Sequence, residues 1–234
     1  MLTIFTILKP SCSKRIEEVQ NQSIESWKRI KEKNQILLFS SDLKMNEYGT
    51  PYLNDAFLTA CSKSQNNILM YTNADIIFTS DILPIITCVS DLFSKFLIVG
   101  CRTDISNVII DFENPKWEER LHKMAVTNGK QHSATGIDYF IFTKEMVRAI
   151  NMPSFVVGRP AWDNWLIARC RELKYPVIDA TGYILALHQN HDYCHLKDGI
   201  KEMRNGKEAS HNITLAGDRL QKITDADYCV EDLL

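Results

Sequence analysis

The chain has 234 residues, of which 45% are apolar and 24% are charged, and its formal net charge is −2 at pH 7. A chain of this length can bury a sizeable core, and we expect one large domain with a C-terminal appendage. Because the charge is nearly balanced and lysines and arginines do not cluster, we do not expect the protein to bind nucleic acid.

The apolar N-terminal segment, 2–8, is only seven residues long. It lacks a preceding basic region and is followed by Lys9 and Pro10, so it predicts a first strand and not a signal peptide. No apolar run approaches the length of a membrane span, and we expect a protein without one.

Strands and helices are predicted to alternate through the first hundred residues. The predicted strands cover 2–8, 36–39, 68–71 and 96–100, and the predicted helices cover 14–33 and the segments after Pro51 and Asp81. This alternation is typical of parallel crossover units and predicts half of a doubly wound sheet. No glycine-rich phosphate loop accompanies it, so a bound diphosphate would need a metal ion instead.

One acid follows the predicted strand 68–71. After Thr72, Asn73 and Ala74 the chain reaches Asp75. In an open α/β sheet the carboxyl ends of the strands form the edge at which ligands bind. A carboxylate beside an amide there suits magnesium or manganese carrying a diphosphate. For this tripeptide taken alone, a turn that Asp75 caps is the better explanation.

The second half of the chain is less regular. Strands are predicted at 108–112, 139–143, 176–180 and 183–187, and helices at 115–126 and from the turn at 158–165 to about 173. Beyond residue 195 the chain is polar, which indicates a wrapping tail with helical pieces.

Three loops of this half carry reactive side chains. The segment after the strand 183–187 holds His188, His191, Asp192 and His195, a set that suits a metal or a phosphate. Two tryptophans, Trp162 and Trp165, bracket Asp163 and Asn164. Aromatic rings, a carboxylate and an amide together suit the binding of a sugar. Alternatively, both indoles belong to the core and Asp163 caps its helix. Asp138 precedes the strand 139–143, where turn chemistry is the simplest explanation.

Seven cysteines are scattered along the chain, at positions 12, 61, 88, 101, 170, 194 and 229. Their number is odd, most lie in apolar segments, and no pair has the C-x-x-C spacing of a structural zinc site. The pattern predicts free buried thiols in a reducing compartment, and hence a cytoplasmic location.

Eight short segments occur in a fixed order between residues 2 and 195: ILKP, NEYGTP, YTNADIIF, FLIVGCR, TGIDYFIF, GRPAWDNWL, VIDAT and HQNHDYCH. In this series the chain resembles nucleotide-sugar glycosyltransferases of the GT-A fold, and more closely a sparsely characterised group of predicted glycosyltransferases. The resemblance implies one GT-A-like α/β domain over 1–195, with a mixed, mainly parallel central sheet flanked by helices. Residues 1–104 would be the nucleotide-binding half, 105–195 the acceptor half and 196–234 the tail.

The resemblance also implies a donor site. Thr6, Lys9 and Asp42 match the positions that hold the nucleotide, and Asn73 and Asp75 match an Asp-x-Asp motif that binds ribose and metal. Because asparagine stands first here, Asp75 is the firm metal ligand. A histidine after the last strand, His191 or His188, would complete the site for Mn²⁺ or Mg²⁺, with His195 a bystander.

On the acceptor side the resemblance implies a general base if the enzyme inverts the sugar. Asp163 matches that position and Asp138 is the next choice, whereas a retaining enzyme would need neither. The side chains that would shape the sugar and acceptor pockets are Arg159, Trp162, Asn164 and Trp165.

The implied activity is the metal-dependent transfer of a sugar from a UDP- or GDP-sugar to a glycan or another hydroxyl acceptor. A metal-dependent phosphohydrolase is the alternative that His191 and Asp192 suggest, although such sites lie on helices of all-α domains. A non-catalytic nucleotide- or carbohydrate-binding protein is a third possibility. A sugar-phosphate nucleotidyltransferase would be expected to carry a glycine-rich N-terminal signature, which is missing.

Overall fold

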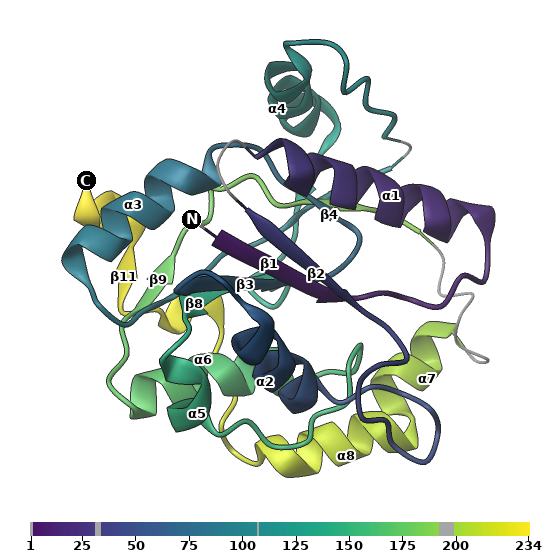
Figure 1. Ribbon diagram of the computed structural model, residues 1–234, viewed down its shortest axis with the longest axis vertical. Coiled ribbons are helices and arrows are strands. Elements are labelled where there is room, and N and C mark those ends of the chain that lie inside the picture. Colours follow the sequence, from purple (N-terminus) through teal and green to yellow (C-terminus); the bar gives the residue numbers. More distant parts are fainter. Residues whose placement is uncertain (1, 31–33, 107, 192–198) are drawn as a thin grey trace.

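The structure, a computed structural model, describes residues 2–30, 34–106, 108–191 and 199–234 (Figure 1). A central seven-stranded sheet has the strand order β11-β9-β5-β8-β3-β1-β2. Its strands are β1 Leu2–Ile7, β2 Gln35–Phe39, β3 Ile68–Thr72, β5 Leu97–Val99, β8 Tyr139–Thr143, β9 Val177–Asp179 and β11 Tyr228–Cys229. Strand β8 runs antiparallel to β3 and β5, and the other neighbouring pairs are parallel. The sheet is therefore mixed and mainly parallel, as predicted.

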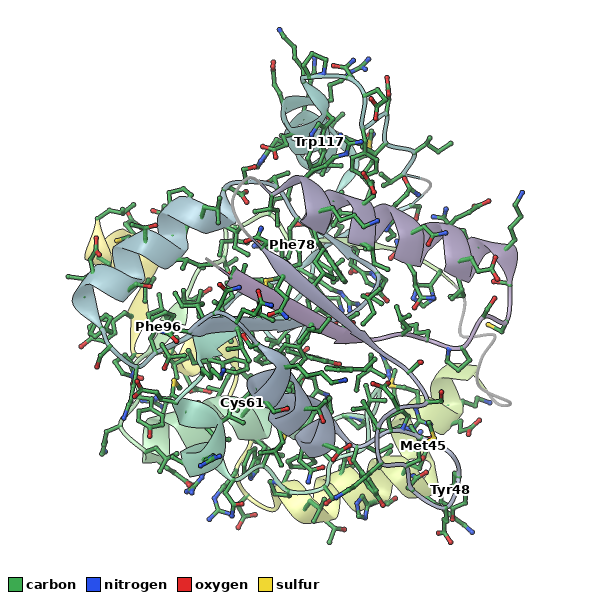
Figure 2. All side chains as sticks on the ribbon, in the orientation of Figure 1. Met45, Tyr48, Cys61, Phe78, Phe96 and Trp117 are labelled. Carbon is green, nitrogen blue, oxygen red and sulfur yellow. The ribbon has the colours of Figure 1, made fainter. Side chains whose placement is uncertain are left out.

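Helices cover both faces of this sheet. The helices α1 Lys14–Arg29 and α3 Ile82–Leu92 lie on one face, and α2 Leu53–Lys63, α5 Met146–Ile150 and α6 Trp162–Glu172 lie on the other (Figure 1). Figure 2 shows Phe78 between α1 and the sheet. The interior is thus two apolar layers, one on each side of the sheet.

Helix α1 shows why the sequence forms these layers. Its buried side chains include Ile16, Val19, Ser23 and Trp27, which recur every three or four residues and make one apolar stripe. The hydroxyl of Ser13 accepts a hydrogen bond from the backbone N–H of Ile16 at 3.3 Å and so caps the first turn. The stripe and the cap together fix which face of the helix meets the sheet.

A second sheet of four short strands has the order β4-β10-β6-β7. Its strands are β4 Ile76–Ile77, β10 Leu187–Gln189, β6 Thr103–Ile105 and β7 Lys130–Gln131. The register places His188 beside Ile76 of β4 and beside Asp104 of β6. Helix α4 Trp117–Asn128 projects beyond this sheet (Figures 1 and 2). Its Trp117 and Leu121 form an apolar cluster with Ile77, Ile105 and Leu187 of the sheet. This sheet gathers residues that are far apart in the sequence.

Two sequence predictions are wrong in this region. Residues 108–112, predicted as a strand, have no strand assignment; the strand lies earlier, at β6. Val108 is buried against Trp117 and Leu121, so its apolar character reflects packing and not strand pairing. The strand predicted at 183–187 begins only at Leu187, because residues 181–184 form a turn.

The segment after residue 198 is structured. It forms α7 Gly199–Asn205, α8 Lys207–Ala216, two short 3-10 helices at Ile223–Asp225 and Val230–Leu233, and the edge strand β11. Helix α8 packs on α6, and β11 pairs in parallel with β9. No helix in the described parts of the chain is long and apolar enough to cross a membrane.

The cysteines are mostly free thiols, as predicted. Cys61, Cys88, Cys101, Cys170 and Cys229 are free, but the prediction that such thiols are buried is right only for Cys170 among these five. The prediction is wrong for Cys12, which is disulfide-bonded, because a pairing depends on tertiary proximity that residue spacing does not reveal. Cys194 lies outside the described residues.

Candidate active site

Asp75 lies between β3 and β4 and is only 2% exposed. Its backbone carbonyl accepts a hydrogen bond from the N–H of Gln189 at 3.2 Å, which ties it to β10. Its Oδ2 accepts a hydrogen bond from the ammonium of Lys9 and lies 2.9 Å from Nε2 of His191 and 3.6 Å from Nε2 of His188. One carboxylate oxygen is therefore the meeting point of three side chains from distant segments.

The same residues suit a metal ion. One potential ligand atom from each of Asp75, His188 and His191 lies within 4.8 Å of the others. The second carboxylate oxygen of Asp75, Oδ1, is buried and has no hydrogen-bond partner among the described residues. Because buried polar atoms are normally paired, this oxygen is one that a ligand would satisfy. The donor set therefore fits a divalent cation.

The charges of this cluster shift two pKa values. Burial alone would raise the pKa of Asp75, but the neighbouring Lys9 and His188 hold it well below its usual range. Burial alone would lower the pKa of His188, but Asp75 and Asp104 outweigh it and raise that pKa to about 9. The carboxylate is thus ionised at neutral pH, in the form that binds cations.

Asp138 anchors the other side of the site. One of its carboxylate oxygens accepts a hydrogen bond from the amide of Asn73, and the other accepts one from Nη1 of Arg102 at 2.8 Å. Thr72 Oγ1 donates to the backbone carbonyl of Asp138 at 3.0 Å. Asn73, which stands where an Asp-x-Asp motif has its first aspartate, therefore orients Asp138.

Arg102 and Asp104 connect the two sides. Nε of Arg102 lies 2.9 Å from Oδ1 of Asp104, an ion-pair contact, and that oxygen lies 2.9 Å from Nδ1 of His188. A continuous chain of polar contacts thus leads from Asp138 to the ring of His188 and on to Asp75. Neither residue is among the site residues predicted from the sequence. Arg102 follows a buried strand, which was a usable signal, whereas Asp104 meets His188 only through the β6–β10 register.

Thr6 and Asp42, which were also predicted for the donor site, differ from each other in their contacts. The hydroxyl of Thr6 in β1 is buried without a partner in the described part of the chain, so it too has a free hydrogen-bonding capacity. Asp42 accepts a hydrogen bond from the N–H of Ser40 at 2.9 Å and lies 3.8 Å from the ammonium of Lys63. Asp42 therefore stabilises its own turn.

Asp163 lies in the first turn of α6, which the left-handed residue Ala161 (φ 81°) introduces. Its Oδ1 accepts a hydrogen bond from the N–H of Asn164 at 2.9 Å. Burial raises the pKa of Asp163 to about 6; the hydrogen bond opposes this shift and the charge of Asp138 adds to it. The pKa is thus close to that of a base that works near neutral pH.

The remaining residues expected near a sugar are held by the protein itself. Trp162 is 6% exposed and packs on Phe140, with ring centroids 4.8 Å apart, and Trp165 is 4% exposed. Asn164 donates to the carbonyl of Gln221 at 2.7 Å. Arg159 forms a buried ion pair with Glu208 of α8. Asp192 and His195 lie outside the described residues.

No protein-family model and no curated protein sequence matches the chain. Among solved structures, the crystal structure of S. aureus TarS 1-349 is similar, with a TM-score of 0.43 and 8% identity, covering 81% of this chain and 57% of that chain. The crystal structure of S. aureus TarS 1-349 in complex with UDP-GlcNAc has a TM-score of 0.51 and 10% identity, covering 97% of this chain and 67% of that chain.

The second of these similarities bears on the fold. It extends over nearly the whole of this chain, while the chain spans only about two thirds of the TarS structure. Together with the mixed, mainly parallel sheet between two helical layers, it shows the architecture that the sequence predicted. The chain has the fold of a single GT-A-like domain.

Proposed function

We propose that the protein is a metal-dependent glycosyltransferase that moves a sugar from a nucleoside-diphosphate sugar to an acceptor hydroxyl. The observation that carries this proposal is the cluster of Asp75, His188 and His191, with the unpartnered Oδ1 of Asp75, at the carboxyl end of β3. In open α/β sheets this edge is where nucleotide ligands bind.

The cation would be held by Asp75, His191 and His188. When bound, it supplies positive charge that stabilises the departing diphosphate. Between the two ions expected from the sequence, the donor set favours Mn²⁺ over Mg²⁺, because two imidazoles are better ligands for a transition metal than for a hard ion that prefers oxygen.

Lys9, Thr6 and Asn73 are proposed to bind the nucleotide, with Asp42 at the outer edge of the same site. The ammonium of Lys9 and the free hydroxyl of Thr6 come from the end of β1 and suit phosphate and ribose oxygens. The similar TarS structure contains UDP-GlcNAc, which favours a UDP-sugar over a GDP-sugar as the donor.

Asp163 is the proposed general base for an acceptor hydroxyl. With a pKa near 6 it is mostly ionised at neutral pH and still basic enough to accept a proton. Asp138 is the weaker candidate, because Arg102 and Asn73 already occupy its carboxylate oxygens. Trp162, Trp165, Arg159 and Asn164 would then shape the acceptor side by packing and hydrogen bonding, not by direct stacking on a sugar.

Two alternatives remain as outcomes of a test. A phosphohydrolase with a His-Asp site would place its histidines on helices, whereas His188 lies on β10. A binding protein without activity would retain the nucleotide but not turn it over. The cytoplasmic location is also a proposal: five free cysteines favour it, and the disulfide at Cys12 does not.

The test is release of nucleoside diphosphate from UDP-GlcNAc, UDP-glucose and GDP-mannose, with Mn²⁺ and with EDTA. We expect one UDP-sugar to release UDP in Mn²⁺, slowly with water as the acceptor, and EDTA to stop the release. Binding without release would indicate the non-catalytic protein. Hydrolysis of simple phosphate esters, without action on any nucleotide sugar, would indicate the phosphohydrolase.

A further inference from the structure

The ammonium of Lys9 uses two of the three groups that would hold a metal ion. It donates a hydrogen bond to Oδ2 of Asp75, and it lies 2.7 Å from Nε2 of His191. A lysine ammonium has only donors, so the imidazole nitrogen contributes its lone pair to this contact when the ring carries its proton on Nδ1; in the other tautomer Nε2 donates to Oδ2 of Asp75, 2.9 Å away. That lone pair, and the same carboxylate oxygen, are what a divalent cation would require.

The main chain at Lys9 is held by two hydrogen bonds, while its side chain reaches the cluster from a partly exposed position. Its backbone N–H donates to Oε1 of Gln20 at 2.8 Å, and Nε2 of Gln20 donates to the Lys9 carbonyl at 3.3 Å. Gln20 is itself a buried residue of α1. The Lys9 side chain, by contrast, is 23% exposed and has a flexible four-carbon stem. The ammonium can therefore change partners without a change in the backbone.

We propose that Lys9 is a resident cation of this site, which a divalent metal ion displaces from Asp75 and His191, and that the released ammonium then binds the donor diphosphate. This inference rests on the proposed function. Two cations cannot share Oδ2 of Asp75 without strong repulsion. A diphosphate, which carries several negative charges, offers the displaced ammonium a new partner beside the metal.

The proposal predicts that metal and nucleotide assist each other. Without nucleotide, the metal must compete with Lys9 for its ligands and binds weakly. With nucleotide, the ammonium is drawn to the phosphates, which frees Asp75 and His191 for the metal. By linkage, the factor by which UDP improves the affinity for Mn²⁺ equals the factor by which Mn²⁺ improves the affinity for UDP.

The test is a Mn²⁺ titration of the full chain, read from the electron paramagnetic resonance of free Mn²⁺, with and without UDP. Lys9→Met keeps the length of the side chain and removes its charge. We expect this variant to bind Mn²⁺ about tenfold or more tightly than the parent when UDP is absent. UDP should improve that affinity much less than it does in the parent. Lys14→Met, on the exposed face of α1, is the matched control and should behave as the parent.

The outcomes separate this inference from the proposed function. Lys9→Met that binds Mn²⁺ no more tightly than the parent overturns the displacement and leaves the metal site in place. Failure of both proteins to bind Mn²⁺, with or without UDP, overturns the metal site and the displacement together. Lys9→Gln serves as the second uncharged variant if Lys9→Met does not fold, which circular dichroism would show.

Discussion

Asp75 is a buried carboxylate and Asp163 a partly buried one, and their surroundings shift their pKa values in opposite directions. Lys9 and His188 hold the pKa of Asp75 well below its usual range, whereas burial raises that of Asp163 to about 6. Burial disfavours the charge in both cases, so the difference lies in the partners: two cationic groups face the first, and one backbone N–H and another acid face the second. A site with one permanently ionised carboxylate and one that can exchange a proton has the components for binding a cation and for base catalysis.

The largest expected effect is at the cation-binding end. Asp75→Ala should abolish the Mn²⁺-dependent binding of UDP, because it removes the one carboxylate among the three proposed metal ligands and leaves two imidazoles beside the ammonium of Lys9. The fold should persist, as checked by circular dichroism. Isothermal titration with UDP, with and without Mn²⁺, measures the effect. Unchanged Mn²⁺-dependent affinity would refute the role of Asp75.

At the opposite end, Asp163→Asn should lower turnover by roughly two to four orders of magnitude while leaving donor binding nearly unaffected. The asparagine keeps the shape of the side chain and an acceptor for the N–H of Asn164, but it cannot take up a proton. Steady-state kinetics with a glycosyl acceptor, together with UDP titration, separates the two quantities. Transfer at nearly the parental rate would favour a retaining mechanism, or Asp138 as the base.

A smaller effect is expected from the groups that support the metal ligands. His191→Ala should weaken Mn²⁺ binding, more so than His188→Ala, since His191 lies closer to Oδ2 of Asp75. Asp104→Ala should weaken the binding of Mn²⁺ by about 10-fold to 100-fold, because the carboxylate of Asp104 orients the ring of His188.

A double-mutant comparison shows whether Asp104 acts through His188. If it does, Asp104→Ala causes no further loss of Mn²⁺ affinity when His188 is already alanine. Additive losses would mean that Asp104 acts by its charge alone. Glu113→Ala also removes a carboxylate, but an exposed one that pairs with Arg29, and serves as the control.

The smallest effect concerns stability. Because the pKa of Asp163 is about 6 in the folded protein and about 4 in an unfolded chain, the folded state binds more protons between these values. The stability that the protonated group contributes is complete below about pH 4 and is lost as the pH rises through 6. Asp163→Asn should therefore gain about 2 kcal/mol over the parent between pH 4 and pH 7. Urea denaturation of the parent and the variant at several pH values measures this difference in the free energy of unfolding. A difference that does not change with pH would show that the pKa of Asp163 is not raised in the folded protein.

The part of the site that local sequence could predict is the part built from strand ends. Asp75 follows a short apolar strand and His188 follows an apolar run, so each could be picked out as a candidate at a strand end. Their meeting depends on the second sheet, in which β4, just after Asp75, pairs with β10. Asp104 could not be found this way, because β6 is a polar strand of three residues whose pairing with β10 spans a long stretch of chain. The more apolar residues 108–112 were the stronger strand signal, yet they pack on α4 without pairing.

The tryptophans illustrate a second limit. Trp162 and Trp165 are large aromatic residues beside an acid and an amide, a pattern that a sugar site and a core helix share. Only the three-dimensional packing distinguishes the two, and it places both indoles against core aromatics. The disulfide at Cys12 depends likewise on contacts that no local pattern contains.

The edge strand β11 has a consequence for how the chain behaves outside the folded state. It pairs with β9 along Ile178 and Asp179, and Asp227 just before it accepts hydrogen bonds from the N–H of Val177 and from Arg171, 50 and 56 residues earlier. Until β11 docks, β9 is an open edge, with unpaired N–H and C=O groups beside the apolar side chains of Val177 and Ile178. Such an edge can pair with a strand of another molecule. Release of β11, by a protease cut after α8 for example, would therefore turn this side of the sheet into a template for aggregation.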